Sequence, residues 1–165
     1  MKVKRVLIPI TALLVLFAVA PVMAAPATQT PFTAHATFIT GNISPGEMWA
    51  RTKERNIVQI RGSTSTGNVA GDISGTVLLV ADETFDMNTG LGLNHGEFVI
   101  AVVGGTYEGS FRSMFTGLSF SGTFVGQGTG TLEGQVLMGS YEGEVTYVDT
   151  LPVAHMAIEG VILSP

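Results

Sequence analysis

The chain has no cysteine among its 165 residues. It therefore has no disulfide, no thiolate metal ligand, no thiol nucleophile and no cysteine for a lipoprotein anchor. A chain of this length buries roughly two-thirds of its unfolded surface. We therefore expect one domain that is held together by its hydrophobic core alone.

Basic residues are scarce and unevenly placed. Three of the eight Lys and Arg residues lie at the start of the chain, at Lys2, Lys4 and Arg5. Without these, five basic residues remain against 13 Asp and Glu, a net charge of −8. An acidic domain of this kind is a poor partner for nucleic acid, whose phosphates are bound through Lys and Arg.

The basic start precedes an uncharged apolar run from Val6 to Val22 and then small residues at Ala24 and Ala25. This order is typical of a secretory signal peptide. We assign residues 1–25 to a signal helix, 26–31 to a flexible leader and 32–165 to the domain. The mature chain is then secreted or held in the cell envelope, with no membrane contact after cleavage. An uncleaved anchor is the alternative.

Beyond residue 31 the sequence lacks helical periodicity, and all 21 glycines follow residue 40. Between Leu118 and Val136, apolar or glycine residues alternate with polar ones, as in strands with one buried face. We expect a turn at Gly126–Gly130 and a bulge or turn near Gly139, where the alternation changes parity. Further strands are predicted at 33–40, 47–53, 56–63, 73–81, 97–103 and 155–163. The pattern predicts an all-β domain, namely an antiparallel barrel of about eight strands, with a β-sandwich as the alternative.

Three glycine-rich segments resemble hairpins of a known group of barrels. They are Gly105-Thr-Tyr-Glu-Gly-Ser-Phe111, Phe120-Ser-Gly-Thr-Phe-Val-Gly-Gln-Gly-Thr-Gly-Thr-Leu-Glu-Gly134 and Gly139-Ser-Tyr-Glu-Gly143. This stretch resembles the allene-oxide-cyclase-like barrels, which include the dirigent proteins. The resemblance implies an eight-stranded antiparallel barrel with a ligand-sized interior, often in dimers or trimers. No motif here matches the catalytic residues of the plant cyclases.

A barrel interior lined by aromatic side chains favours binding of a small apolar ligand, which is our leading hypothesis for the function. The same side chains would otherwise fill the interior, as in many small barrels. The candidate wall residues are Phe111, Phe115, Phe120, Phe124, Tyr141 and Tyr147.

A second hypothesis is a cofactor-free isomerase or cyclase acting in the barrel cavity. Glu108 and Arg112 lie on one strand face, where a carboxylate near a guanidinium serves as an acid or base if that face lines a cavity. His35 and His155 open the first and last predicted strands, which are neighbours in a closed barrel. The alternatives are that Glu108 and Arg112 lie on an exposed face, and that the histidines are isolated residues near strand ends.

One loop has the spacing of oxygen ligands in a twelve-residue calcium loop. The candidate ligands are Asp86, Asn88, Asn94 and Glu97, and calcium is the one candidate cofactor. Leu91 stands where such loops need glycine, and the flanks are predicted to be strands. A polar loop between two strands is therefore the alternative.

The segments Thr76–Ala81 and Phe98–Val103 are apolar on both faces. Such strands are buried on both sides, either within a sandwich or under a second subunit. We therefore expect either a sandwich core or a homo-oligomer. A third hypothesis for the function is a structural or adhesive envelope protein whose outer faces mediate assembly.

Overall fold

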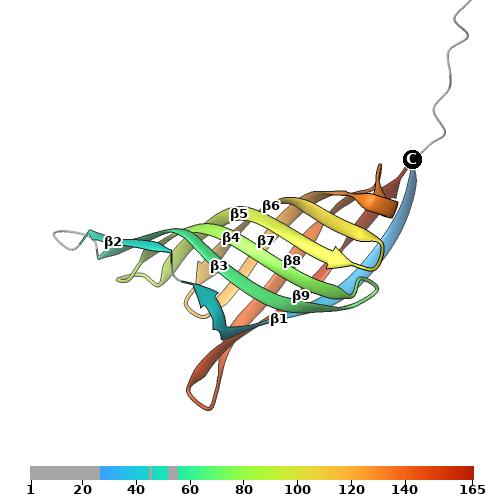
Figure 1. Cartoon of the computed structure of the whole chain (residues 1–165). Helices are drawn as coiled ribbons and strands as arrows, with labels where there is room; N and C mark the ends of the chain where they lie inside the picture. The colour runs from blue at the N-terminus through green and yellow to red at the C-terminus, as the bar shows by residue number, and fades with distance from the viewer. Residues whose placement is uncertain (1–26, 45, 52–55) are drawn as a thin grey trace, which may run out of the picture.

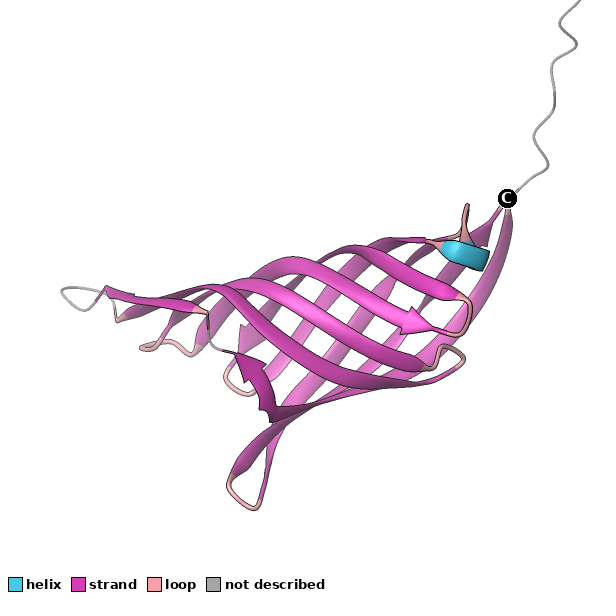
Figure 2. Ribbon diagram, in the orientation of Figure 1, coloured by secondary structure: helices cyan, strands magenta, loops and turns pink. Residues whose placement is uncertain are grey.

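The computed structural model describes residues 27–44, 46–51 and 56–165. The predicted signal helix and residues 52–53 of a predicted strand lie outside this part. Apart from one 3₁₀ turn, η1, the described elements are strands (Figure 2). Their bounds are β1 Thr28–Ser44, β2 Glu47–Arg51, β3 Ile57–Gly71, β4 Gly75–Asp86, β5 Leu91–Val102, β6 Gly105–Thr116, β7 Ser119–Gly128, η1 Gly130–Leu132, β8 Val136–Val148 and β9 Leu151–Ser164. No helix in this part of the chain is long and apolar enough to cross a membrane.

The strands form one closed antiparallel barrel. Pairing runs in the order β1-β9-β8-β7-β6-β5-β4-β3, and β1 also pairs with β3 from Ala34–Gly71 to Ser44–Thr64. The eight-stranded barrel is therefore confirmed and the sandwich is excluded. β2 pairs with β3 outside the ring and extends it beyond the barrel (Figure 1).

Alternation along each strand divides the barrel into an apolar inside and a largely polar outside. On β6, Tyr107 and Phe111 are buried, whereas Glu108, Ser110 and Arg112 between and beyond them are exposed. The parity change arises in the turn between β7 and β8, since Val136 already faces outward and Leu137 inward. The bulge predicted near Gly139 is therefore wrong, because that glycine lies within a regular strand.

The inner glycines are explained by the aromatic rings beside them. Seven inward-facing rings lie over a glycine of another strand, so closely that a Cβ there would lie within 3 Å of the ring. Aromatic rings covering glycines in this way are a known device of strongly curved sheets. The pairs are Phe32–Gly160, Phe38–Gly67, Phe85–Gly92, Phe98–Gly126, Phe120–Gly143, Phe124–Gly139 and Tyr141–Gly122.

The two ends of the barrel differ. At the terminal end, β1 begins beside the end of β9, with Thr28 opposite Ser164 (Figure 1). The opposite end, here called the hairpin end, carries the turns between β4 and β5, β6 and β7, and β8 and β9. The β8–β9 hairpin and the β2–β3 extension both project at this end (Figure 1).

Candidate functional site

A row of polar side chains crosses the inside of the barrel at one level. Glu83 on β4, Asn94 on β5 and Ser113 on β6 are opposite one another in register. Gly122 on β7 and Tyr141 on β8 continue the row. Each polar residue occupies an inward position that apolar residues or glycine fill at neighbouring levels. We call Glu83, Asn94, Ser113 and Tyr141 the inner polar row.

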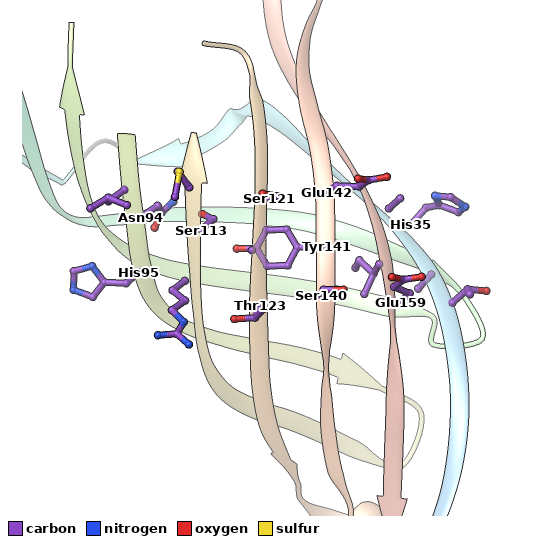
Figure 3. A pocket seen from close by; sticks show the side chains of 18 residues that line it. His35, Asn94, His95, Ser113, Ser121, Thr123, Ser140, Tyr141, Glu142 and Glu159 are labelled. Carbon is purple, nitrogen blue, oxygen red and sulfur yellow. The ribbon is translucent and has the colours of Figure 1, made fainter. Parts of the chain in front are cut away.

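Tyr141 reaches across β7 to Ser113. The Tyr141 ring lies over Gly122, where a Cβ would be 2.5 Å from its Cζ and 2.6 Å from its hydroxyl oxygen. Only glycine at this position leaves room for the ring, which Figure 3 shows beside β7. Tyr141 and Ser113 are each 8% exposed and share a hydrogen bond. Burial raises the pKa of the Tyr141 phenol above its usual value, and the bond to Ser113 opposes this rise.

The rest of the row is only partly satisfied by hydrogen bonds. The buried Ser63 hydroxyl donates to Glu83 Oε1 at 2.8 Å and lies 3.2 Å from the Ala81 carbonyl oxygen. Asn94 Oδ1 is enclosed and accepts no hydrogen bond from the described residues. A buried acceptor without a donor costs about 1–3 kcal/mol, so Asn94 lowers the stability of the barrel at this position.

The space around the row is filled. Toward the hairpin end lie Phe85, Phe115 and Phe120, with 5.3 Å between the ring centroids of Phe115 and each of the other two. Toward the terminal end, Phe124 lies against both Tyr141 and Phe98. The interior cavity found among the described residues has a volume of about 60 Å³ and an almost wholly apolar lining. Drug-sized ligands occupy pockets of roughly 300–1,000 Å³.

The predicted ligand wall is mostly inside the barrel. Phe111, Phe120 and Tyr141 are buried, and Phe115 and Phe124 pack against the same core. Tyr147 is the exception, because β8 extends past the rim and leaves this side chain 61% exposed. The assignment of Tyr147 to the wall is therefore wrong, although it has the inward parity of its strand.

The predicted acid–base residues lie on the outside. Glu108 and Arg112 are exposed because Tyr107 and Phe111 take the inward positions of β6. His35 and His155 do come from neighbouring strands, since Thr37 pairs with His155 and His35 with Ala157. Both histidines are exposed and lie along one open furrow of about 760 Å³ on the outer wall, so the structure places neither this pair nor Glu108 and Arg112 inside the barrel.

The structure does not bring the four candidate calcium ligands together. Asp86 ends β4 and binds the Asn88 backbone N–H at 2.9 Å, which makes a tight hairpin turn. The side chain of Asn88 accepts a bond from Asn56 Nδ2 at 2.9 Å. Asn94 and Glu97 belong to β5 and point to opposite faces of it, so the four oxygens do not converge. Among the described residues, no three His, Asp or Glu side chains are placed to hold a metal ion.

The outer wall carries shallow furrows between successive rows of side chains. One of about 1120 Å³ crosses β5, β6, β7, β8, β9 and β1. Short side chains, including Ser121, Thr123 and Ser140, form its middle (Figure 3). His95 and His35 lie at opposite edges of this view and point away from each other (Figure 3). The furrow is therefore an open surface without converging catalytic groups.

Exposed apolar side chains gather at the hairpin end. Met87, Leu118 and Leu151 lie in or beside the three turns and are 65%, 53% and 53% exposed. Other exposed apolar residues on the strands that lead to these turns are Leu91, Leu93, Met114, Tyr147 and Val148. Side chains of this size are normally exposed singly, and their concentration on one end indicates a contact surface.

Sequence reasoning missed Glu83, Ser63 and Ser113. A signal for Glu83 was present, because it shares the parity of Val77, Leu79 and Phe85 on an otherwise apolar face. Ser113 likewise falls between Phe111 and Phe115. The pairing that brings these residues to one level joins separate strands, and no local pattern indicates it.

Comparison with known proteins adds little. No family model matches the chain, and no curated protein matches it. A solved structure that aligns with it is the crystal structure of Ail, the attachment invasion locus protein of Yersinia pestis. The alignment has 12% sequence identity, covers 84% of this chain and 99% of the Ail chain, and has a TM-score of 0.18. A score this low supports no conclusion about function.

Proposed function

We propose that this chain is a structural or adhesive protein of the cell envelope that acts through the outside of its barrel. The observation that carries the proposal is the filled interior, whose cavity of about 60 Å³ is several-fold smaller than a typical ligand pocket. In a barrel with a filled interior, the surfaces that other molecules can contact are the outer wall and the two ends. The N-terminal segment, with its basic, apolar and small residues in order, supports export to the envelope.

The hairpin end is the best supported contact surface. Three separate turns present bulky apolar residues there, including Met87, Leu118 and Leu151. The wall itself carries exposed charges at mid-height, such as Arg112, Glu142 and Glu159. This polarity, apolar inside and charged outside, is the reverse of that in a membrane-spanning barrel. The proposal therefore assigns attachment to the hairpin end and solvent contact to most of the wall.

The test measures how much of the exported chain cosediments with the envelope of its producing cell. We expect the triple variant Met87→Ser, Leu118→Ser, Leu151→Ser to be released into the soluble fraction, because apolar contact is lost. The matched control is Leu78→Ser, Val80→Thr, Val103→Ser, which removes exposed apolar side chains away from the hairpin end and leaves retention unchanged. Equal retention of both variants contradicts the proposal.

Native mass spectrometry of the exported chain tests the competing hypothesis of a small apolar ligand. A chain without a bound small molecule is the expected result. A stoichiometric ligand retained in the barrel would instead require the aromatic rings to move apart, and would favour the binding function over the proposed one.

A further inference from the structure

β2 is an edge strand of the sheet. It continues the line of β1 along β3, since Ser44 pairs with Thr64 and Glu47 with Arg61. β9, which covers the other edge of β1, pairs with β1 only as far as Ile39. The β2–β3 extension and the β8–β9 hairpin then project in different directions (Figure 1). β2 therefore has β3 on one side, and none of the described strands pairs with its other edge.

A strand edge without a partner is a surface for the addition of another strand. Its free backbone N–H and C=O groups are donors and acceptors that a second strand satisfies. Proteins commonly protect such an edge with a proline, a bulge or charged side chains. The sequence of β2, Glu47-Met-Trp-Ala-Arg51, has no proline and pairs with β3 without a bulge. Its two charged residues lie at its two ends and have opposite signs, so the edge is open to a strand of matching charge.

The sequence of β2 is complementary to itself in the antiparallel direction. When two copies of the strand are paired about Trp49, Glu47 of each copy is opposite Arg51 of the other. In the same register, Met48 of each copy is opposite Ala50 of the other. Opposite charges across an antiparallel pair stabilise it, and like charges destabilise it. A second β2 strand therefore supplies the pattern of charges that this edge fits.

We infer that β2 pairs with β2 of a second copy of the chain, which gives one sheet that is continuous through both copies. A two-fold axis perpendicular to the sheet, between the two Trp49 positions, relates the strands, as in the isologous contacts that are commonest in homo-oligomers. This inference concerns a different part of the surface from the turns to which attachment is assigned.

The positions on β3 fit the same register. Within each copy, Arg61 is opposite Glu47, and Ile57 is opposite Arg51. Each Glu47 position then lies in a row between Arg61 of its own copy and Arg51 of the other. The central row contains only uncharged positions, because Gln59 is opposite Trp49. Within the paired length of β2, no two positions of like charge are opposite each other.

Sedimentation velocity on the exported chain, over a range of protein and salt concentrations, tests the pairing. The wild type is expected to form a dimer that weakens as salt increases, because salt screens the paired charges. Arg51→Glu places two carboxylates opposite each other twice per dimer, and Glu47→Arg does the same with two guanidinium groups. Each variant alone should raise the dimer dissociation constant about tenfold or more. An equal mixture of the two variants restores opposite charges in both pairs, so the mixture should form dimers that are as stable as those of the wild type.

The fluorescence of Trp49, the single tryptophan of the chain, tests where the two copies meet. The proposed axis passes beside this residue, so pairing should shield it from water. Its emission maximum is expected to move to shorter wavelength over the same concentration range in which the dimer forms. A wild-type dimer that forms without this shift would show that the copies meet elsewhere, and would overturn the inference.

Arg112→Glu is the matched control, because it makes the same charge change at an exposed position on β6. It should leave the dissociation constant within about threefold of the wild-type value. Circular dichroism verifies that every variant is folded. The inference is overturned by a monomeric or trimeric wild type, by a mixture of the two β2 variants that associates no better than either alone, or by an Arg112→Glu effect as large as that of Arg51→Glu.

Discussion

Tyr141 and Gly122 illustrate how single residues specify this interior. The tyrosine lies at the centre of the aromatic packing, with ring centroids 6.3 Å from Phe120 and 6.4 Å from Phe124. Its hydroxyl bonds Ser113 two strands away, which is geometrically allowed only because the intervening residue has no side chain. A buried polar pair of this kind favours one register, since any slip leaves both groups unsatisfied.

Gly122→Ala is expected to destabilise the barrel by about 1–3 kcal/mol, the usual cost of an overpacked core. The added methyl would meet both the Tyr141 ring and the backbone oxygen of Arg112. Urea unfolding followed by circular dichroism measures the effect. Ser121→Ala, one residue away on the outer face, is the control and should change stability by no more than about 0.5 kcal/mol. Equal midpoints for the two variants contradict the packing argument.

The buried tyrosines predict an alkaline limit to stability. The pKa values of Tyr141 and Tyr107 are raised by burial above the ordinary value of 10.0, which applies in the unfolded chain. Their contribution is therefore fully present below pH 10.0 and is lost as pH rises through the folded pKa values, because the unfolded state releases protons first.

Urea midpoints measured from pH 8 upward test this prediction. The wild-type midpoint should fall above pH 10.0, and Tyr141→Phe should show a shallower fall. The variant should also be less stable at neutral pH, because Ser113 loses its partner. Adding Ser113→Ala removes the orphaned hydroxyl and should recover part of that loss. A variant with the full wild-type slope at high pH would show that Tyr141 does not titrate as described.

At the scale of the element, each hairpin places its strands in register through its turn. The β8–β9 connection has only two residues, Asp149 and Thr150, with φ of +49° and +73°. A two-residue hairpin turn whose twist matches that of its strands requires a positive φ at both residues, and glycine is preferred at the second one. A β-branched residue such as Thr150 is strained at a positive φ.

Thr150→Gly should therefore stabilise the barrel by about 0.5–1 kcal/mol. Thermal unfolding monitored by circular dichroism is the measurement. Thr146→Gly, four residues earlier in the regular part of β8, should instead lower stability, because glycine weakens a strand interior. A loss of stability in T150G would mean that the threonine makes contacts beyond its turn.

The elements also show which local predictions were sound. The turn placed at Gly126–Gly130 is observed, since β7 ends at Gly128 and η1 follows. The strands were predicted too short, since those predicted at 56–63 and 73–81 leave out Asn68, Asp82 and Glu83, which belong to β3 and β4. In the barrel these polar side chains are accommodated at outward positions or in the inner polar row, so β3 and β4 continue through them.

At the scale of the whole molecule, the barrel closes between segments at opposite ends of the sequence. β1 pairs with β9 over twelve residue pairs, from Thr28–Ser164 to Ile39–Val153, and on its other edge with β3. The ring of eight strands thereby has no free edge, which matters because edge strands otherwise promote aggregation, and β2 lies outside this ring. Closure of this kind depends on contacts far apart in the chain.

Because the first residues of β1 pair with the last residues of β9, the two termini of the barrel domain are adjacent, and a circular permutant is expected to fold. A short Gly-Ser linker joins Pro165 to Ala27, and new termini open between Thr89 and Gly90 in the exposed β4–β5 turn. Surface turns tolerate such breaks. Opening the chain between Thr123 and Phe124, within β7, should prevent folding. Circular dichroism and cooperative melting distinguish the two, and failure of the first permutant would show that the β4–β5 turn must be intact.

The resemblance to allene-oxide-cyclase-like barrels remains a prediction at this scale. Its implied architecture, an eight-stranded antiparallel barrel, agrees with the structure. The implied ligand-sized interior contrasts with the cavity of about 60 Å³. The aromatic residues that predicted a ligand wall, such as Phe120 and Phe124, are the ones that fill the space.

The sequence by itself determined the strand content, the absence of covalent cross-links and the two faces of each strand, because alternation and composition are local properties. Only the tertiary structure decided that the sheet closes on itself, that Glu108 and Arg112 face solvent, and that Glu83, Asn94, Ser113 and Tyr141 share one level. The reason is that register and closure result from pairing between distant segments, so the same alternating pattern is compatible with several sheets until those pairs are formed.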